Sequence, residues 1–550
     1  MAPNSKPAKA PRRPNILVLM TDQHRFNALR CAGNQKIRTP NLDALAASGV
    51  HFTNACCATP VCVASRMSLI TGQRMARHHW TANAALPGPL PELPTLMTLL
   101  HRAGYQTHAV GKMHFRGRHY GLETHERMEE GVRARIDDDY LMDLKEHGVR
   151  TRHPQGLRDL LYCQPQTVGI AEEHSQNAWV AQRSIEFLRR HTRYRGGKPF
   201  LLWASWTAPH PPYAPCEPYD SLYDPGEMDL PINAERPLAS IPSAAWAHRA
   251  RLDGAHLDPD RMRRIRALYY GQVSHVDEAA GRILGELETL GLSDNTVILF
   301  TSDHGDMLGD HGLSQKNVPY ELSVRVPMLL RWPGRTEAGR VCDDLVGLTD
   351  VLPTLTEGLG LPYPDAPAPL PGSGLLGQEG GGLSSEREAF FIDYGHGPNR
   401  WIALRTRKHK YALWADSGCE ELYDLEADPR ECTNLRESEP KLTAKLRATV
   451  LAWEREHGLP GSFDGEQFRT YPGKPLPDGL PRRVVVNEGP WVSNLPEDER
   501  HTVETYAEAF TRAISKETSL SPEKLSLALY KRKGGTPLIG TPWEKAWRDA

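Results

Sequence analysis

The sequence lacks the features that mark nucleic-acid-binding, membrane-spanning and zinc-ribbon proteins. Its 550 residues carry a formal net charge of only −2, which gives no long-range field for nucleic acid or an anionic membrane surface. No run approaches the ~20 apolar residues of a membrane helix. The nine cysteines include no C-x-x-C pair. We therefore expect no nucleic-acid partner and no membrane partner.

A secretory signal is also missing from the amino terminus of this chain. Met1–Pro14 is rich in Lys, Arg and Pro and has no apolar core. The cysteines are odd in number and scattered, which is typical of reduced intracellular thiols, although one or two disulfides would fit the same count. We expect a cytoplasmic protein with a flexible tail over residues 1–13, unless a signal segment was removed before the chain begins.

The length predicts two domains, because 550 residues exceed the size at which one hydrophobic core stops growing. A stretch rich in Pro, Gly and Ser marks the boundary, and short β-rich runs after it predict a small antiparallel sheet. Two helices are predicted near 497–516 and 521–531, in an extension that is an oligomer arm or a substrate lid. The arm is slightly favoured, so we expect a homo-oligomer. The predicted parts are a tail (1–13), a main domain (14–360), a linker or loop (361–385), an antiparallel-sheet subdomain (386–456) and the extension (457–550).

Three β-rich apolar runs predict strands of the main domain: Ile16–Met20, Phe200–Trp206 and Thr296–Ser302. They show no polar alternation, which is typical of strands buried on both faces of a mostly parallel sheet. Apolar residues at helical spacing over 261–290 predict a long helix packed on that sheet. Functional groups of such α/β sheets gather at the carboxyl ends of the strands. The polar residues that follow these runs are therefore the first candidates for a site.

Asp22, His210 and the pair Asp303-His304 stand in these positions. Asp303 and His304, opposite Asp22, are suitable ligands for a single cation. Taken alone, an Asp that follows a strand, as Asp22 does, is more often a helix cap. Prolines on both sides of His210 fix its backbone, so its ring direction should be well defined. A loop histidine of this kind is also often only structural.

Two further segments combine a nucleophile or a base with a cation. Cys62-Val63-Ala64-Ser65-Arg66 places a cysteine four residues before an arginine in a helix-compatible stretch, which suits an anionic substrate. Alone, this spacing is more often a buried cysteine near a surface arginine. Lys112 and His114 follow a predicted strand over 107–110 and share one face of an extended segment. The alternative is an exposed lysine beside a packed histidine.

Taken together, these motifs resemble the type I, formylglycine-dependent sulfatases of the alkaline phosphatase superfamily. The resemblance rests on Cys62-x-Ala64-Ser65-Arg66 followed by Leu69-x-Thr71-Gly72, and on the other motifs in the same order. Ala64 replaces the commoner proline, and Gln73 stands where arginine is usual. The resemblance implies an alkaline-phosphatase-like α/β fold, with a central mostly parallel sheet flanked by helices. It also implies a smaller C-terminal subdomain with an antiparallel sheet, whose hallmark Glu421–Leu425 resembles.

The family's chemistry would be hydrolysis of a sulfate monoester, on a carbohydrate or an aryl group, to an alcohol and inorganic sulfate. The resemblance implies that a formylglycine-generating enzyme oxidises Cys62 to formylglycine, whose hydrate attacks sulfur. It implies a divalent cation, expected to be Ca²⁺ because its ligands are mainly hard oxygens. The nitrogen of His304 would suit Mn²⁺ or Zn²⁺ better. The implied ligands are Asp22, Gln23, Cys62, Asp303 and His304.

The resemblance also implies a role for each of the other candidates. Arg66, Lys112 and Lys316 would balance charge on the sulfuryl oxygens, and Asp303 would be the base for the attack. His210, together with Lys316, would protonate the departing alcohol. His114 would take the proton of the second hydroxyl, so that sulfate is expelled as the aldehyde forms again.

The residues that bind the rest of the substrate are less well specified. Arg77 and His78 could meet a carboxylate or a second anionic group, or simply form a solvated helix face. Tyr120 could stack on a sugar or aryl ring, and Tyr213 could wall the pocket. The Asp303-His304 pair and Gly111–Phe115 also resemble phosphonate monoester hydrolases and related cytoplasmic sulfatases. Phosphonate monoester or phosphodiester hydrolysis is therefore the alternative activity, and an anion-binding pseudoenzyme with an unmodified Cys62 is less favoured.

Overall fold

An eight-stranded sheet forms the centre of the computed structural model, which describes residues 13–130, 138–149, 154–156, 163, 165–195, 197–246, 248, 258–364, 369–376 and 387–475. The strand order is β5-β4-β6-β1-β7-β8-β2-β9. Within the sheet β8 runs antiparallel to both its neighbours, and the other strands share one direction. The strands are β1 (Asn15–Asp22), β2 (Val50–Phe52), β4 (Gln106–Gly111), β5 (Thr124–Arg127), β6 (Phe200–Pro209), β7 (Thr296–Ser302), β8 (Met328–Arg331) and β9 (Arg340–Cys342).

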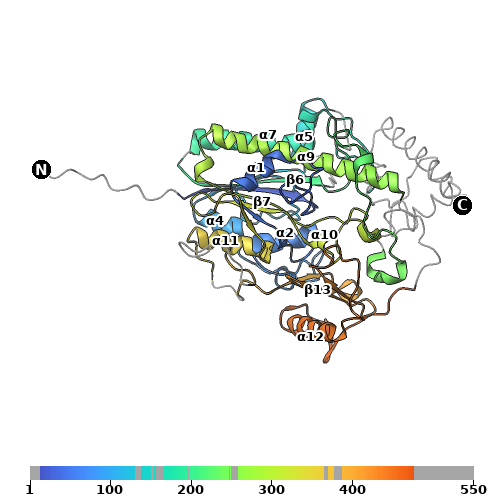
Figure 1. The fold of residues 1–550 in the computed structure, drawn as a ribbon. Coiled ribbons are helices and arrows are strands. Elements are labelled where there is room, and N and C mark those ends of the chain that lie inside the picture. Colours follow the sequence, from blue (N-terminus) through green and yellow to red (C-terminus); the bar gives the residue numbers. More distant parts are fainter. Residues whose placement is uncertain are drawn as a thin grey trace, which may run out of the picture.

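Helices cover both faces of this sheet (Figure 1). Successive β1 side chains pack alternately into two cores: Ile16, Val18 and Met20 into one, Leu17 and Leu19 into the other. Because both faces are buried, the strand needs no polar alternation, and the predicted α/β fold is confirmed. One face carries α1 (Pro40–Ala47), α7 (Gln176–Arg195) and α9 (Pro259–Thr289), and the other carries α2 (Cys62–Thr71), α4 (Leu96–Arg102) and α11 (Val351–Gly358).

The predicted C-terminal antiparallel sheet is also present. Its strands β11 (Ala389–Tyr394), β12 (Trp401–Thr406), β13 (His409–Trp414) and β14 (Glu420–Asp424) pair in sequence order. Helix α12 (Pro440–His457) covers one of its faces and buries Leu446 and Val450. A buried ion pair joins this sheet to the main domain: Arg405 of β12 lies 3.0 Å from Glu321 of α10 (Glu321–Val324).

The remaining elements are short. They are β3 (Ala55–Cys56), α3 (Met75–His78), α5 (Asp139–Glu146), β10 (Val346–Gly347), β15 (Phe463–Asp464) and β16 (Gln467–Phe468). Within the described part of the chain, no helix is long and apolar enough to cross a membrane. The predicted helices near 497–516 and 521–531 lie outside the described residues, as do most of the predicted tail and part of the predicted linker.

Candidate active site

The carboxyl ends of neighbouring strands bring the predicted ligands together. Strands β1 and β7 are parallel and in register, with Thr21 opposite Ser302. Asp22 and Asp303 therefore meet at the same edge of the sheet, where both are fully buried. This edge also receives Cys62, the first residue of α2.

Asp22, Cys62, Asp303 and His304 form one cluster, in which each offers a ligand atom within 4.8 Å of the others. The Cys62 Sγ lies 3.3 Å from His304 Nε2 and 3.8 Å from Asp22 Oδ1. His304 Nδ1 lies 3.0 Å from the carbonyl oxygen of Gly305, so Nδ1 carries a hydrogen and Nε2 is left to face the cluster. Two carboxylates and a ring nitrogen fit a divalent cation at this place.

Arg66, one helical turn after Cys62, ties the cluster to the neighbouring strands. Its Nε donates to Asp303 Oδ2 at 2.8 Å, and its Nη1 donates to the carbonyl oxygen of Lys112 at 2.6 Å. Lys112 Nζ in turn donates to Asp22 Oδ2. Burial raises the pKa of both carboxyls, but neighbouring groups outweigh it. Lys112, His210 and Arg66 bring the pKa of Asp22 below its usual value. His304, Arg66 and Lys112 do the same for Asp303. Both carboxyls are therefore ionised at neutral pH.

The thiol of Cys62 is not activated in these surroundings. Burial raises its pKa to about 12, and the nearby Asp22 carboxylate acts in the same direction. An unmodified Cys62 would therefore be uncharged at neutral pH and a weak nucleophile.

His114 and His210 lie close to this cluster. Cys62, His114 and Glu130 offer ligand atoms within 4.8 Å of one another, and among the described residues His114 Nδ1 has no hydrogen-bond partner. Burial, reinforced by Lys112, lowers the pKa of His114 to about 3, so its ring is neutral and can accept a proton. His210 lies at the end of β6, and its Nε2 is 3.5 Å from Glu130 Oε2.

Gln23 and Lys316 lie next to the cluster and bind each other. Lys316 Nζ donates to Gln23 Oε1 at 2.5 Å, and Gln23 Nε2 donates to Asp306 Oδ2 at 2.6 Å. The hydroxyl of Tyr213 donates to the same Asp306 oxygen at 2.7 Å. The carboxamide of Gln23 is thus engaged on both sides, and its role as a metal ligand stays a prediction.

The other predicted substrate residues make contacts of their own. His78 is buried: its Nε2 lies 3.0 Å from Ser68 Oγ, and its Nδ1 accepts from the backbone N–H of Trp80 at 3.1 Å. Arg77 is exposed. Tyr120 is half-buried, with its ring edge-on to Phe115 at 5.1 Å between centroids.

Three acidic residues of this site were not predicted from the sequence: Asp306, Glu129 and Glu130. Glu129 accepts from the backbone N–H of His114 at 2.9 Å. Glu130 accepts from Lys112 Nζ and faces His210. Glu129 and Glu130 follow the short strand β5, whose carboxyl end lies beside that of β4.

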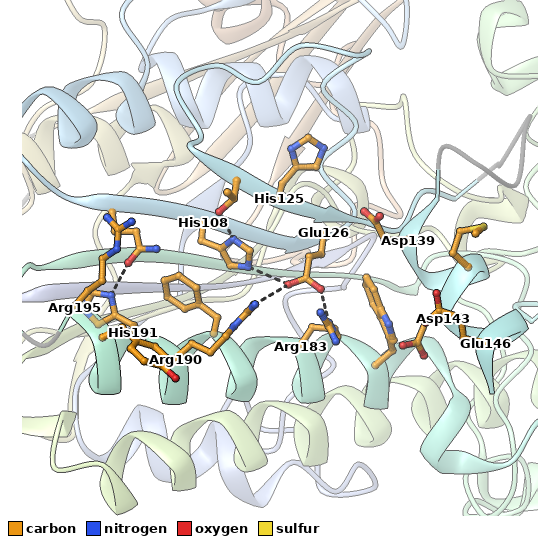
Figure 2. A pocket seen from close by; sticks show the side chains of 16 residues that line it. His108, His125, Glu126, Asp139, Asp143, Glu146, Arg183, Arg190, His191 and Arg195 are labelled. Atoms are coloured by element: carbon orange, nitrogen blue, oxygen red, sulfur yellow. Dashed lines mark hydrogen bonds and ion pairs between the residues drawn. The ribbon is translucent and has the colours of Figure 1, made fainter.

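A separate cavity of about 620 Å³ lies between β5 and α7 (Figure 2). Its charged side chains converge on one another: Glu126 contacts Arg183 and lies 3.5 Å from His108 and 3.7 Å from Arg190. None of the residues that line it belongs to the Cys62 cluster. We therefore expect the chemistry at Cys62, where the predicted catalytic residues meet.

Comparison with known proteins agrees with this geometry. A family model described as sulfatase matches residues 14–361, more than half of the chain. The chain belongs to the sulfatase family. A model of the C-terminal region of N-sulphoglucosamine sulphohydrolase matches residues 309–455 of this sulfatase. The predicted family is confirmed, and with it the enzyme class, a sulfuric ester hydrolase.

Individual relatives cover most of this sulfatase. An arylsulfatase of Clostridium perfringens is 32% identical over 84% of this chain and 98% of its own. An N-acetylglucosamine-6-O-sulfatase of Bacteroides thetaiotaomicron is 28% identical over 77% of this chain and 83% of its own. Among solved structures, a phosphonate monoester hydrolase of Agrobacterium radiobacter aligns with a TM-score of 0.70 and 25% identity, over 81% of this chain and 96% of that one. Its similarity supports the alkaline-phosphatase-like fold.

Proposed function

We propose that this sulfatase cleaves aryl or carbohydrate sulfate monoesters with a formylglycine formed from Cys62. The observation that carries the proposal is the position of Cys62 at the start of α2, 3.3 Å from His304 Nε2 and 3.8 Å from Asp22 Oδ1. A raised thiol pKa makes cysteine itself a poor nucleophile there, whereas an aldehyde hydrate offers two hydroxyls on one carbon. A formylglycine-generating enzyme would be the maturation partner.

A divalent cation held by Asp22, Asp303, His304 and residue 62 would lower the pKa of the attacking hydroxyl. Ca²⁺ is the first expectation, because two of these side chains are carboxylates. The nitrogen of His304 makes Mn²⁺ and Zn²⁺ the alternatives to test. Gln23 would support the site through Lys316.

In the first half of the reaction, formylglycine at position 62 would supply the hydroxyl that attacks sulfur, and Asp303 would accept the proton of that hydroxyl. Arg66, Lys112 and Lys316 hold the sulfuryl oxygens in a water-poor pocket. The bond between sulfur and the leaving oxygen would break, and His210, together with Lys316, would protonate that oxygen. The products are the alcohol and a sulfated residue 62.

In the second half, the neutral ring of His114 takes the proton of the remaining hydroxyl. The carbon–oxygen bond to sulfate breaks and the aldehyde forms again, so no water needs to attack the covalent ester. Arg77, His78, Tyr120 and Tyr213 stay our predictions for substrate contacts. A cytoplasmic location, a homo-oligomer and the domain limits given above stay predictions as well.

The test is a comparison of kcat/KM on an aryl sulfate, an aryl phosphonate monoester and a phosphodiester. The protein is co-produced with a formylglycine-generating enzyme, and the aldehyde at residue 62 is verified by peptide mass. Sulfate turnover that leads by orders of magnitude, and that Cys62→Ala abolishes, supports the proposal and justifies a screen of sulfated glycans. Phosphonate monoester hydrolysis is the second candidate, favoured by the similarity to the Agrobacterium enzyme, and it wins if the phosphonate leads. An unmodified thiol without turnover would favour an anion-binding pseudoenzyme.

A further inference from the structure

Glu130 lies between the residues assigned to the sulfuryl oxygens and to the departing alcohol. It follows β5, so it reaches the same edge of the sheet as Lys112, which follows the neighbouring parallel strand β4. Glu130 Oε2 accepts from Lys112 Nζ and lies 3.5 Å from His210 Nε2. Its side chain is 16% exposed, against 0% for Lys112 and 1% for His210. Glu130 is therefore the member of this trio nearest to solvent, where an alcohol would leave.

The tautomer of His210 turns its exchanging nitrogen toward Glu130. His210 Nδ1 lies 2.6 Å from the carbonyl oxygen of Pro211, which can only accept a hydrogen bond. Nδ1 therefore carries a hydrogen, and Nε2 is the nitrogen that gains or loses a proton. When Nε2 is protonated, its positive charge lies against the Glu130 carboxylate.

The other surroundings of His210 oppose this protonated form. Burial lowers the pKa of His210 well below its usual value, and the cations of Lys316 and Lys112 lower it further. The groups that act in the opposite direction are Glu130 and, less strongly, Asp22. Asp22 is already bonded to Arg66 and Lys112 and belongs to the ligand cluster. Glu130 is thus the carboxylate beside His210 Nε2 that favours the protonated form of the ring.

The geometry points to Glu130 as a positioning residue that holds the proton of His210 Nε2 for the departing alcohol. The inference rests on the proposed function. When the bond between sulfur and the leaving oxygen breaks, its electron pair goes to that oxygen and the Nε2 proton follows. His210 is left neutral and regains a proton from solvent. Lys112 has three N–H donors, so it can bind Asp22 and Glu130 and still donate to a sulfuryl oxygen.

The test compares Glu130→Gln with the wild type on phenyl sulfate and on 4-nitrophenyl sulfate. A nitrophenolate leaves without help, whereas phenolate is more basic and needs the proton. We expect kcat/KM to fall about 10- to 100-fold more on phenyl sulfate than on 4-nitrophenyl sulfate, within the usual range of general-acid catalysis. On phenyl sulfate the alkaline limb of the pH profile should move to lower pH, because His210 loses its proton more easily.

Controls separate this role from a structural one. Glu123→Gln removes another carboxylate from the segment before β5 and should behave as the wild type. Glu130→Asp should recover part of the loss of kcat/KM on phenyl sulfate. In a His210→Ala background, Glu130→Gln should cause no further difference between phenyl sulfate and 4-nitrophenyl sulfate. An equal loss of kcat/KM on both substrates in Glu130→Gln would overturn the inference. A lower KM with unchanged kcat would also overturn it, because Glu130 would then only repel the sulfate group. Absence of sulfate turnover by the wild type would instead count against the proposed function.

Discussion

The guanidinium of Arg66, one turn into α2, reaches the end of β7, where its Nε donates to Asp303 Oδ2 at 2.8 Å. The same side chain donates to the Lys112 carbonyl at 2.6 Å and to Ser205 Oγ at 3.1 Å. One planar guanidinium thus connects the helix that begins at Cys62 to the ends of β7 and β4 and to the middle of β6. A single residue therefore fixes both the position of the nucleophile and the charge of its neighbours.

Arg66→Lys tests whether this fork, rather than the charge alone, is needed. A lysine keeps the charge but cannot make the three contacts at once. We expect kcat/KM on an aryl sulfate to fall about 10²- to 10³-fold. The free energy of unfolding should fall by about 1–3 kcal/mol, since buried acceptors lose a donor. Arg30→Lys, at an exposed arginine, is the matched control; an Arg66→Lys enzyme as active as this control would contradict the argument.

Removal of the cation that we propose for the Asp22–Asp303 cluster should abolish activity and lower the stability together. Asp22 and Asp303 are both fully buried and ionised, so a cation between them offsets their repulsion. With the cation at 100 times its Kd, the loss on chelation is about 2.7 kcal/mol in the free energy of unfolding. The measurement is thermal unfolding and aryl sulfate turnover before and after chelation, followed by addition of Ca²⁺, Mn²⁺ or Zn²⁺.

The matched variant for this experiment is Asp22→Asn, whose stability should respond much less to chelation. If Ca²⁺ alone restores activity and stability, the carboxylate oxygens determine which metal binds. If only Mn²⁺ or Zn²⁺ restores them, the nitrogen of His304 determines it. A fully active protein in which metal analysis finds no divalent cation would exclude this account of the cluster.

Much of this site could be predicted because it depends on strands with an unambiguous pattern. Strands β1 and β7 are continuous apolar runs, and adjacent parallel strands must end at the same edge of the sheet. The proximity of Asp22 to Asp303 follows from that alone. The long helix packed on this sheet was equally regular: α9 occupies Pro259–Thr289, where 261–290 was predicted.

The residues that escaped prediction lie on short or irregular segments. Strand β5 has four residues, none of them buried, so its sequence resembles a charged loop and gave no reason to single out Glu130. Helix α3 also has four residues, too few for periodicity to decide which way His78 points. The contacts of Gln23 depend on Lys316 and Asp306, which are distant in sequence and meet it only in the folded chain.

His78 should make the stability of the protein depend on pH. Burial lowers its pKa to about 3, from about 6.5 in the unfolded chain. The unfolded state therefore binds a proton first, so the contribution of His78 is complete above pH ~6.5 and is lost as the pH falls toward 3. The expected slope is roughly 1.4 kcal/mol per pH unit within this window.

We expect His78→Gln to lose the contribution of His78 to the slope of the unfolding free energy against pH. The measurement is urea unfolding between pH 6.5 and 4. Other buried histidines, such as His24, keep their own contribution in both proteins, so the difference between the two curves isolates His78. The same variant examines the predicted substrate contact. A rise in KM on a sulfated glycan, with the wild-type slope retained, would assign His78 to the substrate instead of the fold.

The buried charges at the junction between the two sheets should stabilise the protein only as pairs, so that removing one partner costs more than removing both. Arg405 donates to both oxygens of Glu321 at 3.0 Å, and Lys410 lies 3.2 Å from Glu321 and also contacts Glu431, all of them buried. Arg405→Leu would leave Glu321 with less compensation in a dry interior. We expect a loss of about 3–5 kcal/mol in the free energy of unfolding, measured in urea.

Replacing both partners should cost less than replacing one. In Arg405→Leu with Glu321→Leu, Lys410 keeps Glu431 as its partner. Arg325, which lies 3.4 Å from Glu321, keeps its hydrogen bond to the carbonyl oxygen of Thr53. Two apolar side chains fill the space of the removed pair. Such replacements are often nearly neutral, so the double variant should recover a large part of the loss. Arg407→Leu removes the ion pairs of an exposed arginine to Asp343 and Asp344, and should cost less than about 1 kcal/mol. If the losses of the two single variants simply add in the double variant, the junction is held by packing, and the buried charges are only tolerated there.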